Sequence, residues 1–145
     1  MSGGKPVYLL DTNILLRFLT NDEARHSPAA RKLFERAKLG QVTLRIPFIT
    51  IAETVFTLQS YYGIDRNDLG RELLKILNAQ GVVLSCPPWI TDAIDDYRAR
   101  NISFGDACLA AEARVEGLPV ASFDKGLSKF PGVVRFDPAS APLSS

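Results

Sequence analysis

Short apolar runs alternate along this chain with stretches in which apolar residues recur every three or four positions. The short runs predict strands over 7–10, 42–46, 82–84, 120–123 and 133–136. The stretches of longer period predict helices over about 13–20, 28–39, 50–62, 67–80, 88–100 and 105–116. Strands that alternate with helices are typical of a parallel sheet covered by helices on both faces. The pattern therefore predicts a three-layer α/β sandwich with four or five parallel strands.

Nothing in this pattern divides the chain into separate domains. No linker, repeat or low-complexity block interrupts it, so residues 1–137 are expected to form one domain, followed by a flexible tail over 138–145. The helices over 50–62 and 67–80 follow one another without an intervening strand. We expect this pair to project as an arm whose apolar stripes serve dimerisation or the docking of a partner.

Composition places the chain among ordinary soluble globular proteins, with 46% hydrophobic and 23% charged residues in 145. It has no apolar run of ~18 residues that could cross a membrane. The first residues lack the apolar core of a signal peptide, so a cytoplasmic location is expected. Cys86 and Cys108 form no Cys-x-x-Cys pair, and we expect two buried thiols, with neither a disulfide nor a zinc site.

The first strand ends abruptly in Asp11-Thr12-Asn13, where the next helix begins. A short continuous apolar run of this kind indicates a buried strand in a parallel sheet. In open α/β sheets the functional crevice lies at the carboxyl ends of the strands. Asp11 is therefore expected at that edge of the sheet.

Three further acids occupy comparable places. Glu53 and Asp106 lie in the first turns of predicted helices, and Asp124 directly follows the strand over 120–123. Taken singly, each acid also has a structural explanation, which we favour for any one of them alone. Asp11 can cap a helix and Asp124 can open a turn. The other two complete the capping-box patterns Thr50-x-x-Glu53 and Ser103-x-x-Asp106.

Taken together, the four acids favour a metal site. In a right-handed α/β topology, helix starts face the same carboxyl edge that strand ends reach, so all four carboxylates can converge. Four carboxylates within a few ångström would repel one another strongly unless a cation neutralised them. Oxygen ligands without His or Cys fit Mg²⁺ or Mn²⁺ and not zinc. Such a site activates water and stabilises charge on a phosphoryl group.

The single histidine, the motifs that are missing and the charge distribution narrow the chemistry to phosphodiester hydrolysis. The single histidine, His26, is expected at the surface and excludes catalysis by paired imidazoles. No Gly-x-Ser-x-Gly elbow, Walker loop or Gly-x-Gly-x-x-Gly motif occurs. The net charge is only +1, but residues 25–45 hold six cations against one acid, Glu35. That segment is either a solvated helix face or a phosphate-facing surface, and its candidate RNA-binding residues are Arg25, Arg31, Lys32 and Arg36.

The acidic motifs, in this order and at these spacings, resemble those of PIN-domain ribonucleases. They are Leu10-Asp11-Thr12-Asn13, Ile51-Ala52-Glu53, Phe104-Gly105-Asp106-Ala107 and Ser122-Phe123-Asp124. The resemblance covers the chain from Val7 to about Phe136, and in length the chain is similar to VapC-type toxins of bacterial and archaeal toxin–antitoxin pairs. It implies a Rossmann-like sheet, a Mg²⁺ or Mn²⁺ site, cleavage of single-stranded RNA, a homodimer and inhibition by a small antitoxin protein.

The resemblance also implies roles for individual residues. Asp11 and Asp106 correspond to the principal metal ligands. Glu53 and Asp124 correspond to acids that bind metal directly or through water, one of which orients the attacking water. The supporting residues, which fix the carboxylates, are Thr12, Asn13 and Ser122. For Asn13 a plain turn role stays open, and for Ser122 that of an incidental polar residue.

Two other functions stay open. A phosphatase of the haloacid-dehalogenase type also begins with an Asp at a strand end, but it needs a second acid where this chain has Asn13, and the chain is short for that class. A non-catalytic module of the same fold would bind RNA or a protein and use the acids only as caps. An acidic pocket beside basic residues also invites an inhibitor that places an Arg or Lys among the carboxylates.

Overall fold

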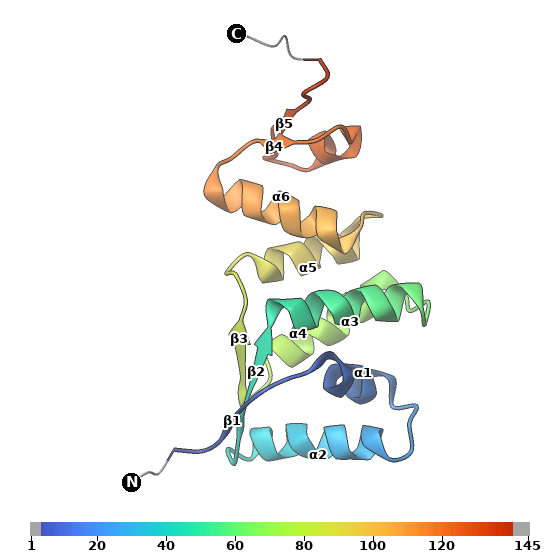
Figure 1. Ribbon diagram of the computed structural model, residues 1–145, viewed down its shortest axis with the longest axis vertical. Helices are drawn as coiled ribbons and strands as arrows, with labels where there is room; N and C mark the ends of the chain where they lie inside the picture. The colour runs from blue at the N-terminus through green and yellow to red at the C-terminus, as the bar shows by residue number, and fades with distance from the viewer. Residues whose placement is uncertain (1–3, 141–145) are drawn as a thin grey trace. The chain divides into compact units, whose positions relative to one another are not determined.

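The computed structural model of the chain describes residues 4–140 (Figure 1). These residues divide into two compact units, unit 1 up to Pro87 and unit 2 from Pro88 onward. Unit 1 contains β1 (Val7–Leu9), α1 (Thr12–Thr20), α2 (His26–Lys38), β2 (Thr43–Pro47), α3 (Phe48–Ser60), α4 (Arg66–Leu77) and β3 (Val82–Ser85). Unit 2 contains α5 (Ile90–Ala99), α6 (Phe104–Glu116), β4 (Val120–Ala121), the 3-10 helix η1 (Lys125–Lys129) and β5 (Arg135–Phe136).

Each strand and helix that the sequence predicts is present, with its ends moved by a few residues. Among the elements of residues 4–140, η1 alone was not predicted, because its five residues are too short to show a helical period. Part of the predicted tail, residues 141–145, lies outside the described residues.

All strand pairs are parallel, as predicted. In unit 1 the strand order is β1-β2-β3, with Tyr8 opposite Leu44 and Ile46 opposite Leu84. In unit 2, β4 pairs with β5. Residues 4–140 contain five strands, within the predicted four or five, in a three-stranded sheet of unit 1 and a two-stranded sheet of unit 2.

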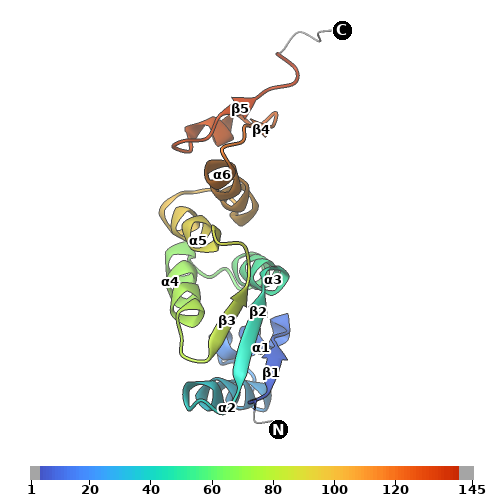
Figure 2. The ribbon, with the colours of Figure 1, turned by 90° about the vertical axis from the view of Figure 1, so that its left-hand side faces the viewer.

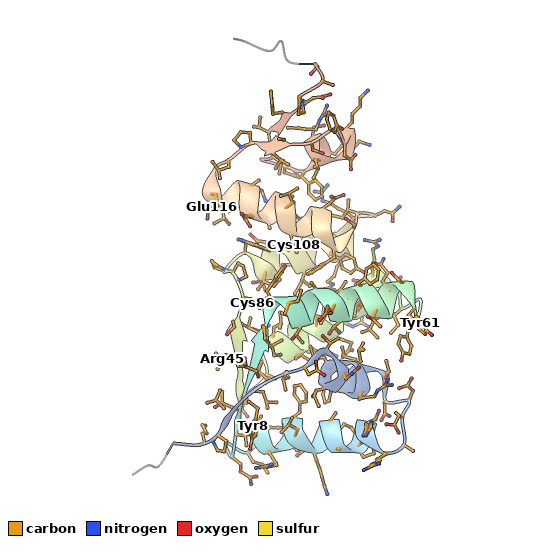
Figure 3. All side chains as sticks on the ribbon, viewed as in Figure 1. Tyr8, Arg45, Tyr61, Cys86, Cys108 and Glu116 are labelled. Atoms are coloured by element: carbon orange, nitrogen blue, oxygen red, sulfur yellow. The ribbon has the colours of Figure 1, made fainter. Side chains whose placement is uncertain are left out.

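The helices of unit 1 lie on one face of its sheet (Figures 1 and 2). The alternation of β2 reflects this arrangement, because Leu44 and Ile46 are fully buried whereas Arg45 between them is exposed (Figure 3). The prediction that the first strand is buried is wrong for β1 itself, since Val7 and Leu9 are 53% and 68% exposed. Within its sheet β1 pairs with β2 alone, and burial begins only at Leu10, where the chain reaches the helices.

The apolar stripes of α3 and α4 belong to the core of unit 1. Ile51, Val55 and Leu73 are fully buried, so the expectation that these stripes serve dimerisation or docking is wrong. The exposed apolar side chains of α3 lie on another face, at Ile49 and Phe56.

Unit 2 has its own apolar cluster under the Ala-rich helix α6. The buried members are Ala110, Ala113, Val120, Leu127, Phe130 and Val133. An ion pair of 2.6 Å between Arg114 Nη2 and Asp96 Oδ2 joins α6 to α5. The apolar cluster holds β4 and η1 on α6, the helix that carries Asp106.

The two cysteines are both free thiols, Cys86 just after β3 and Cys108 in α6 (Figure 3). Burial raises the pKa of Cys108 to about 12, which keeps its thiol protonated and unreactive at neutral pH. Within the described residues, no helix is long and apolar enough to cross a bilayer.

Gly81 holds the connection from α4 to β3 against α2. Its φ of +82° favours glycine, and an added Cβ would lie 2.4 Å from the Ala37 carbonyl oxygen. We expect Gly81→Ala to destabilise the protein by about 3 kcal/mol or more in urea unfolding, because left-handed strain and overpacking each cost about 1–3 kcal/mol.

The matched control is Gly63→Ala. Gly63 has a similar φ of +65°, but nothing lies within 4 Å of an added Cβ. Only the backbone strain of about 1–2 kcal/mol should remain. Equal losses in the two variants would contradict the close approach of Gly81 to α2.

Candidate metal site

Asp11 lies at the end of β1, and its carboxylate is not used by the helix that follows. Its extended backbone (φ −79°, ψ 154°) occupies the N-cap position of α1, yet its side chain makes no capping hydrogen bond. The residue is exposed, and among residues 4–140 its carboxylate has no hydrogen-bond or ion-pair partner. The interpretation of Asp11 as a helix cap is therefore wrong, and the carboxylate is available to a ligand.

Glu53 does not have the capping-box role that was predicted for it. Helix α3 begins at Phe48, with Pro47 at the N-cap position, so Thr50 and Glu53 do not form a capping box. Instead, the Thr12 hydroxyl donates a hydrogen bond of 3.0 Å to Glu53 Oε1. Because Thr12 directly follows Asp11, this bond brings Glu53 to the chain segment that carries the first acid.

Asn13, the third residue of the first motif, lines a cavity of about 390 Å³ between α1 and α2. Arg17 and His26 line the same cavity. A hydrogen bond with Tyr62 is the largest of the causes that raise the pKa of Arg17. His26 is exposed, as predicted, and its Nδ1 lies 2.6 Å from Glu23 Oε2.

In unit 2 the capping and turn roles predicted for Asp106 and Asp124 are confirmed in part. Ser103 caps α6, and its hydroxyl accepts a hydrogen bond of 3.0 Å from the Asp106 backbone N–H. The Asp106 carboxylate itself accepts no hydrogen bond from any described residue. Asp124 caps η1, because its Oδ1 accepts from the Gly126 N–H at 2.8 Å, which confirms the predicted turn role.

Ser122 supports the segment that carries Asp124. Its hydroxyl accepts a hydrogen bond of 2.9 Å from the Asp124 backbone N–H. Its carbonyl accepts another, also of 2.9 Å, from Arg135 Nη1. These bonds fix the backbone on both sides of Phe123 and leave Asp124 Oδ2 without a partner among the described residues.

Each unit thus supplies two of the four acids. Among residues 4–140 no three His, Cys, Asp or Glu side chains gather in a group that could hold a metal ion. In unit 1 the possible metal ligands near the end of β1 are all oxygen atoms. They belong to the exposed carboxylates of Asp11 and Glu53, and the Thr12 hydroxyl is hydrogen-bonded to the Glu53 carboxylate. This donor set fits a hard divalent cation such as Mg²⁺ or Mn²⁺.

Three of the four candidate RNA-binding residues share one face of α2. Arg25, Lys32 and Arg36 are separated by seven and four residues, and all three are exposed. Arg25 precedes the helix in helical conformation, so it continues that face. The result is a basic stripe (Arg25, Lys32 and Arg36) along α2.

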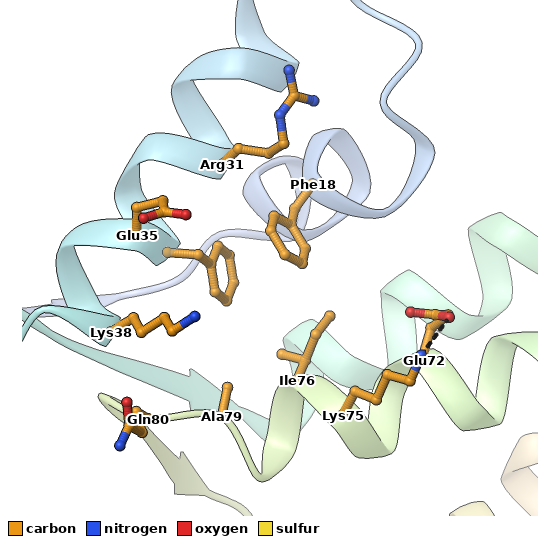
Figure 4. Close-up of a pocket in the computed structure, with 10 residues that line it drawn as sticks. Phe18, Arg31, Glu35, Lys38, Glu72, Lys75, Ile76, Ala79 and Gln80 are labelled. Carbon is orange, nitrogen blue, oxygen red and sulfur yellow. Dashed lines mark hydrogen bonds and ion pairs between the residues drawn. The ribbon is translucent and has the colours of Figure 1, made fainter.

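The fourth candidate, Arg31, points elsewhere. It donates a hydrogen bond to the Asn21 side chain and lines a cavity of about 460 Å³ that contains Phe18 (Figure 4). The ring of Phe18 stacks on that of Phe34 with centroids 4.1 Å apart. Lys38 of α2, which like Arg31 is exposed, lines the same cavity.

Sequence reasoning missed the hydrogen bond that holds the backbone of the residue before Asp11. The buried Thr50 hydroxyl donates to the Leu10 carbonyl at 2.9 Å, next to Asp11. A signal was present in Pro47, whose missing N–H at the end of a strand leaves a neighbouring carbonyl in need of another donor.

Comparison with known proteins supports a common origin with one family. A family model described as PIN domain matches residues 8–133. The chain is also similar to a VapC ribonuclease of Aquifex aeolicus (strain VF5), with 30% identity over 122 residues, 83% of this chain and 90% of that protein. The family match includes all four acids and extends over both units.

We expect Thr12→Val to weaken metal binding by releasing Glu53. Loss of a residue that orients a metal ligand costs about 10–100-fold in affinity, and the exposed position of this bond places the effect near tenfold. The measurement is the Mn²⁺ concentration that gives half of the maximal rise in melting temperature.

Two variants control this experiment. Thr12→Ser keeps a hydroxyl and should behave as the wild type. Thr57→Val removes a hydroxyl one turn beyond Glu53 on α3 and should leave the Mn²⁺ midpoint unchanged. A midpoint unaffected by Thr12→Val would show that the Thr12 hydroxyl does not prepare Glu53 for metal.

Proposed function

The chain belongs to the PIN-domain family, and on that premise we propose that it is a metal-dependent endoribonuclease that cleaves single-stranded RNA as the toxin of a toxin–antitoxin pair. The observation that carries the proposal is that the Asp11 carboxylate makes no capping hydrogen bond. This carboxylate sits at a strand end where a helix could have used it, and the helix does not. The similarity to a VapC ribonuclease supports the same activity.

We propose that all four acids serve one site and that residues 1–137 form one domain. The supporting observation is that a single family match runs from 8 to 133 and includes every acid. Asp11 and Asp106 would be the principal ligands of a Mg²⁺ or Mn²⁺ ion. Glu53 and Asp124 would complete the site, and one of them would orient the attacking water.

The chemistry divides between the ion and the protein. A bound divalent ion would supply positive charge that activates water and neutralises the phosphoryl oxygens. The chain's own residues hold the acids: Thr12 fixes Glu53, and Ser122 fixes the backbone of Asp124. Thr12 and Ser122 thus act as the supporting residues, and Asn13 faces the cavity beside the first motif.

RNA would approach along the basic stripe of α2. Arg25, Lys32 and Arg36 present exposed charge along one helix face, which suits a polyanion of extended shape. Arg31 would contribute less, because it is engaged with Asn21. A cognate antitoxin would inhibit by placing an Arg or Lys among the carboxylates.

A non-catalytic module is the second candidate, and two observations favour it. Ser103 caps α6 at Asp106, and Asp124 caps η1, so two of the four acidic positions also serve local structure. Caps should be indifferent to millimolar metal, whereas a repulsive acid cluster should be stabilised by it. The phosphatase alternative has no support in a PIN-domain chain.

The purified protein with Mn²⁺ or Mg²⁺ should cut single-stranded RNA and should lose this activity in EDTA. Asp11→Asn should lower the rate by about 100-fold or more, since even residues outside the ligand set contribute 10–100-fold. Asp95→Asn, an exposed acid on α5, is the control and should cut RNA at the wild-type rate. Undiminished cleavage by Asp11→Asn, or none by the wild type with either metal, would refute the nuclease.

We also propose a homodimer, and the exposed face of α3 is its candidate interface. Ile49 and Phe56 are 62% and 71% exposed and lie two turns apart on that helix. Phe56→Asp should convert a dimer into a monomer in size-exclusion chromatography with light scattering. Leu39→Asp, a charge at another exposed apolar position, should leave the dimer intact. A monomeric wild type would contradict the proposal.

A further inference from the structure

Thr50 makes a buried tertiary contact at the junction of β1 and α1. It is the third residue of α3, it is 4% exposed, and its hydroxyl donates a hydrogen bond of 2.9 Å to the Leu10 carbonyl. Leu10 is itself 3% exposed and directly precedes Asp11. A side chain of the helix therefore holds the backbone of the residue before the first acid.

The β ladder cannot satisfy this carbonyl. The Leu10 N–H donates to the Arg45 carbonyl at 2.9 Å, which continues the parallel pairing of β1 with β2. In a parallel ladder the Leu10 carbonyl would then accept from the N–H of the residue two positions after Arg45. That residue is Pro47, which has no N–H. The Thr50 hydroxyl replaces the missing donor.

A second hydrogen bond on the other side of Asp11 completes the arrangement. Thr12 Oγ1 donates to Glu53 Oε1 at 3.0 Å, one helical turn after Thr50 on α3. The segment Leu10–Thr12 is thus attached to α3 twice, and Asp11 lies between the attachments. One attachment is backbone and buried, whereas the other is a side-chain contact and exposed.

We infer that Thr50 is a positioning residue for the candidate metal site: it locks the backbone of Leu10 so that the Asp11 carboxylate is held in register with Glu53. This inference rests on the proposed function. Thr50 reaches neither metal nor RNA in this role, because its hydroxyl is occupied by Leu10.

Thr50→Val is the test, because it keeps the shape and removes the donor. Thr50→Ser restores the hydroxyl and should behave as the wild type. Thr54→Val is the matched control: Thr54 is also fully buried, and its hydroxyl donates at 2.6 Å to the Thr50 carbonyl within the same helix. It therefore loses a buried hydroxyl without touching β1.

The first measurement needs neither metal nor RNA. Hydrogen exchange of the backbone amides at 10–14 should accelerate in Thr50→Val and should keep its wild-type rate in Thr54→Val. The second measurement is Mn²⁺ binding followed by electron paramagnetic resonance of the free ion. Affinity should fall by about tenfold in Thr50→Val alone, with kcat for RNA cleavage reduced and KM unchanged.

The outcomes separate this inference from the proposed function. A wild type that binds no Mn²⁺ overturns the proposed site. Binding that is as tight in Thr50→Val as in the wild type overturns only the positioning role, and so does equal exchange in the two valine variants. If Thr50→Val does not fold, Thr50→Cys, which keeps a weak donor of similar size, should show the same changes to a smaller degree.

Discussion

The arrangement of unit 1 depends on where the ladder between β1 and β2 is allowed to end. Pro47 closes β2 and opens α3 without a gap, so one residue both stops the strand and removes a donor. The orphaned carbonyl of Leu10 is buried, and a buried carbonyl without a partner costs roughly 1–3 kcal/mol. The third residue of the new helix supplies the partner, so the strand end and the helix start are fixed by the same contact.

The two units differ in whether their candidate acids lie at capped helix starts. In unit 1 neither the Asp11 nor the Glu53 carboxylate caps a helix, and the Thr12 hydroxyl donates a hydrogen bond to the Glu53 carboxylate. In unit 2 the chain around Asp106 and Asp124 is capped by Ser103 and by Asp124 itself. A carboxylate that caps through one oxygen still offers the other, so local structure and metal binding do not exclude each other.

The order of elements and the parallel pairing were predictable because both follow from apolar periodicity, a property of neighbouring residues. The capping box at Thr50 failed for the opposite reason. The pattern is local, but the Thr50 hydroxyl is taken by a carbonyl forty residues away in sequence. The prediction that β1 is buried failed for a similar reason. An apolar run does not reveal that its strand lies at the edge of the sheet.

The candidate acids were found from their motifs, and the basic stripe from charge alone. What charge could not reveal is that Arg31 turns from the stripe toward Asn21 and the stacked rings of Phe18 and Phe34. Helical spacing separates Arg31 from the face of Lys32, but only tertiary packing decides which face meets solvent.

The unused carboxylate of Asp11 has a consequence for how such a chain changes over time. A residue that supports no cap can be exchanged without weakening the helix, so inactivation at this position carries little penalty in stability. The altered chain would escape the proteolysis that removes misfolded proteins. On the proposed function, it would persist beside active copies and compete with them for the antitoxin and the RNA.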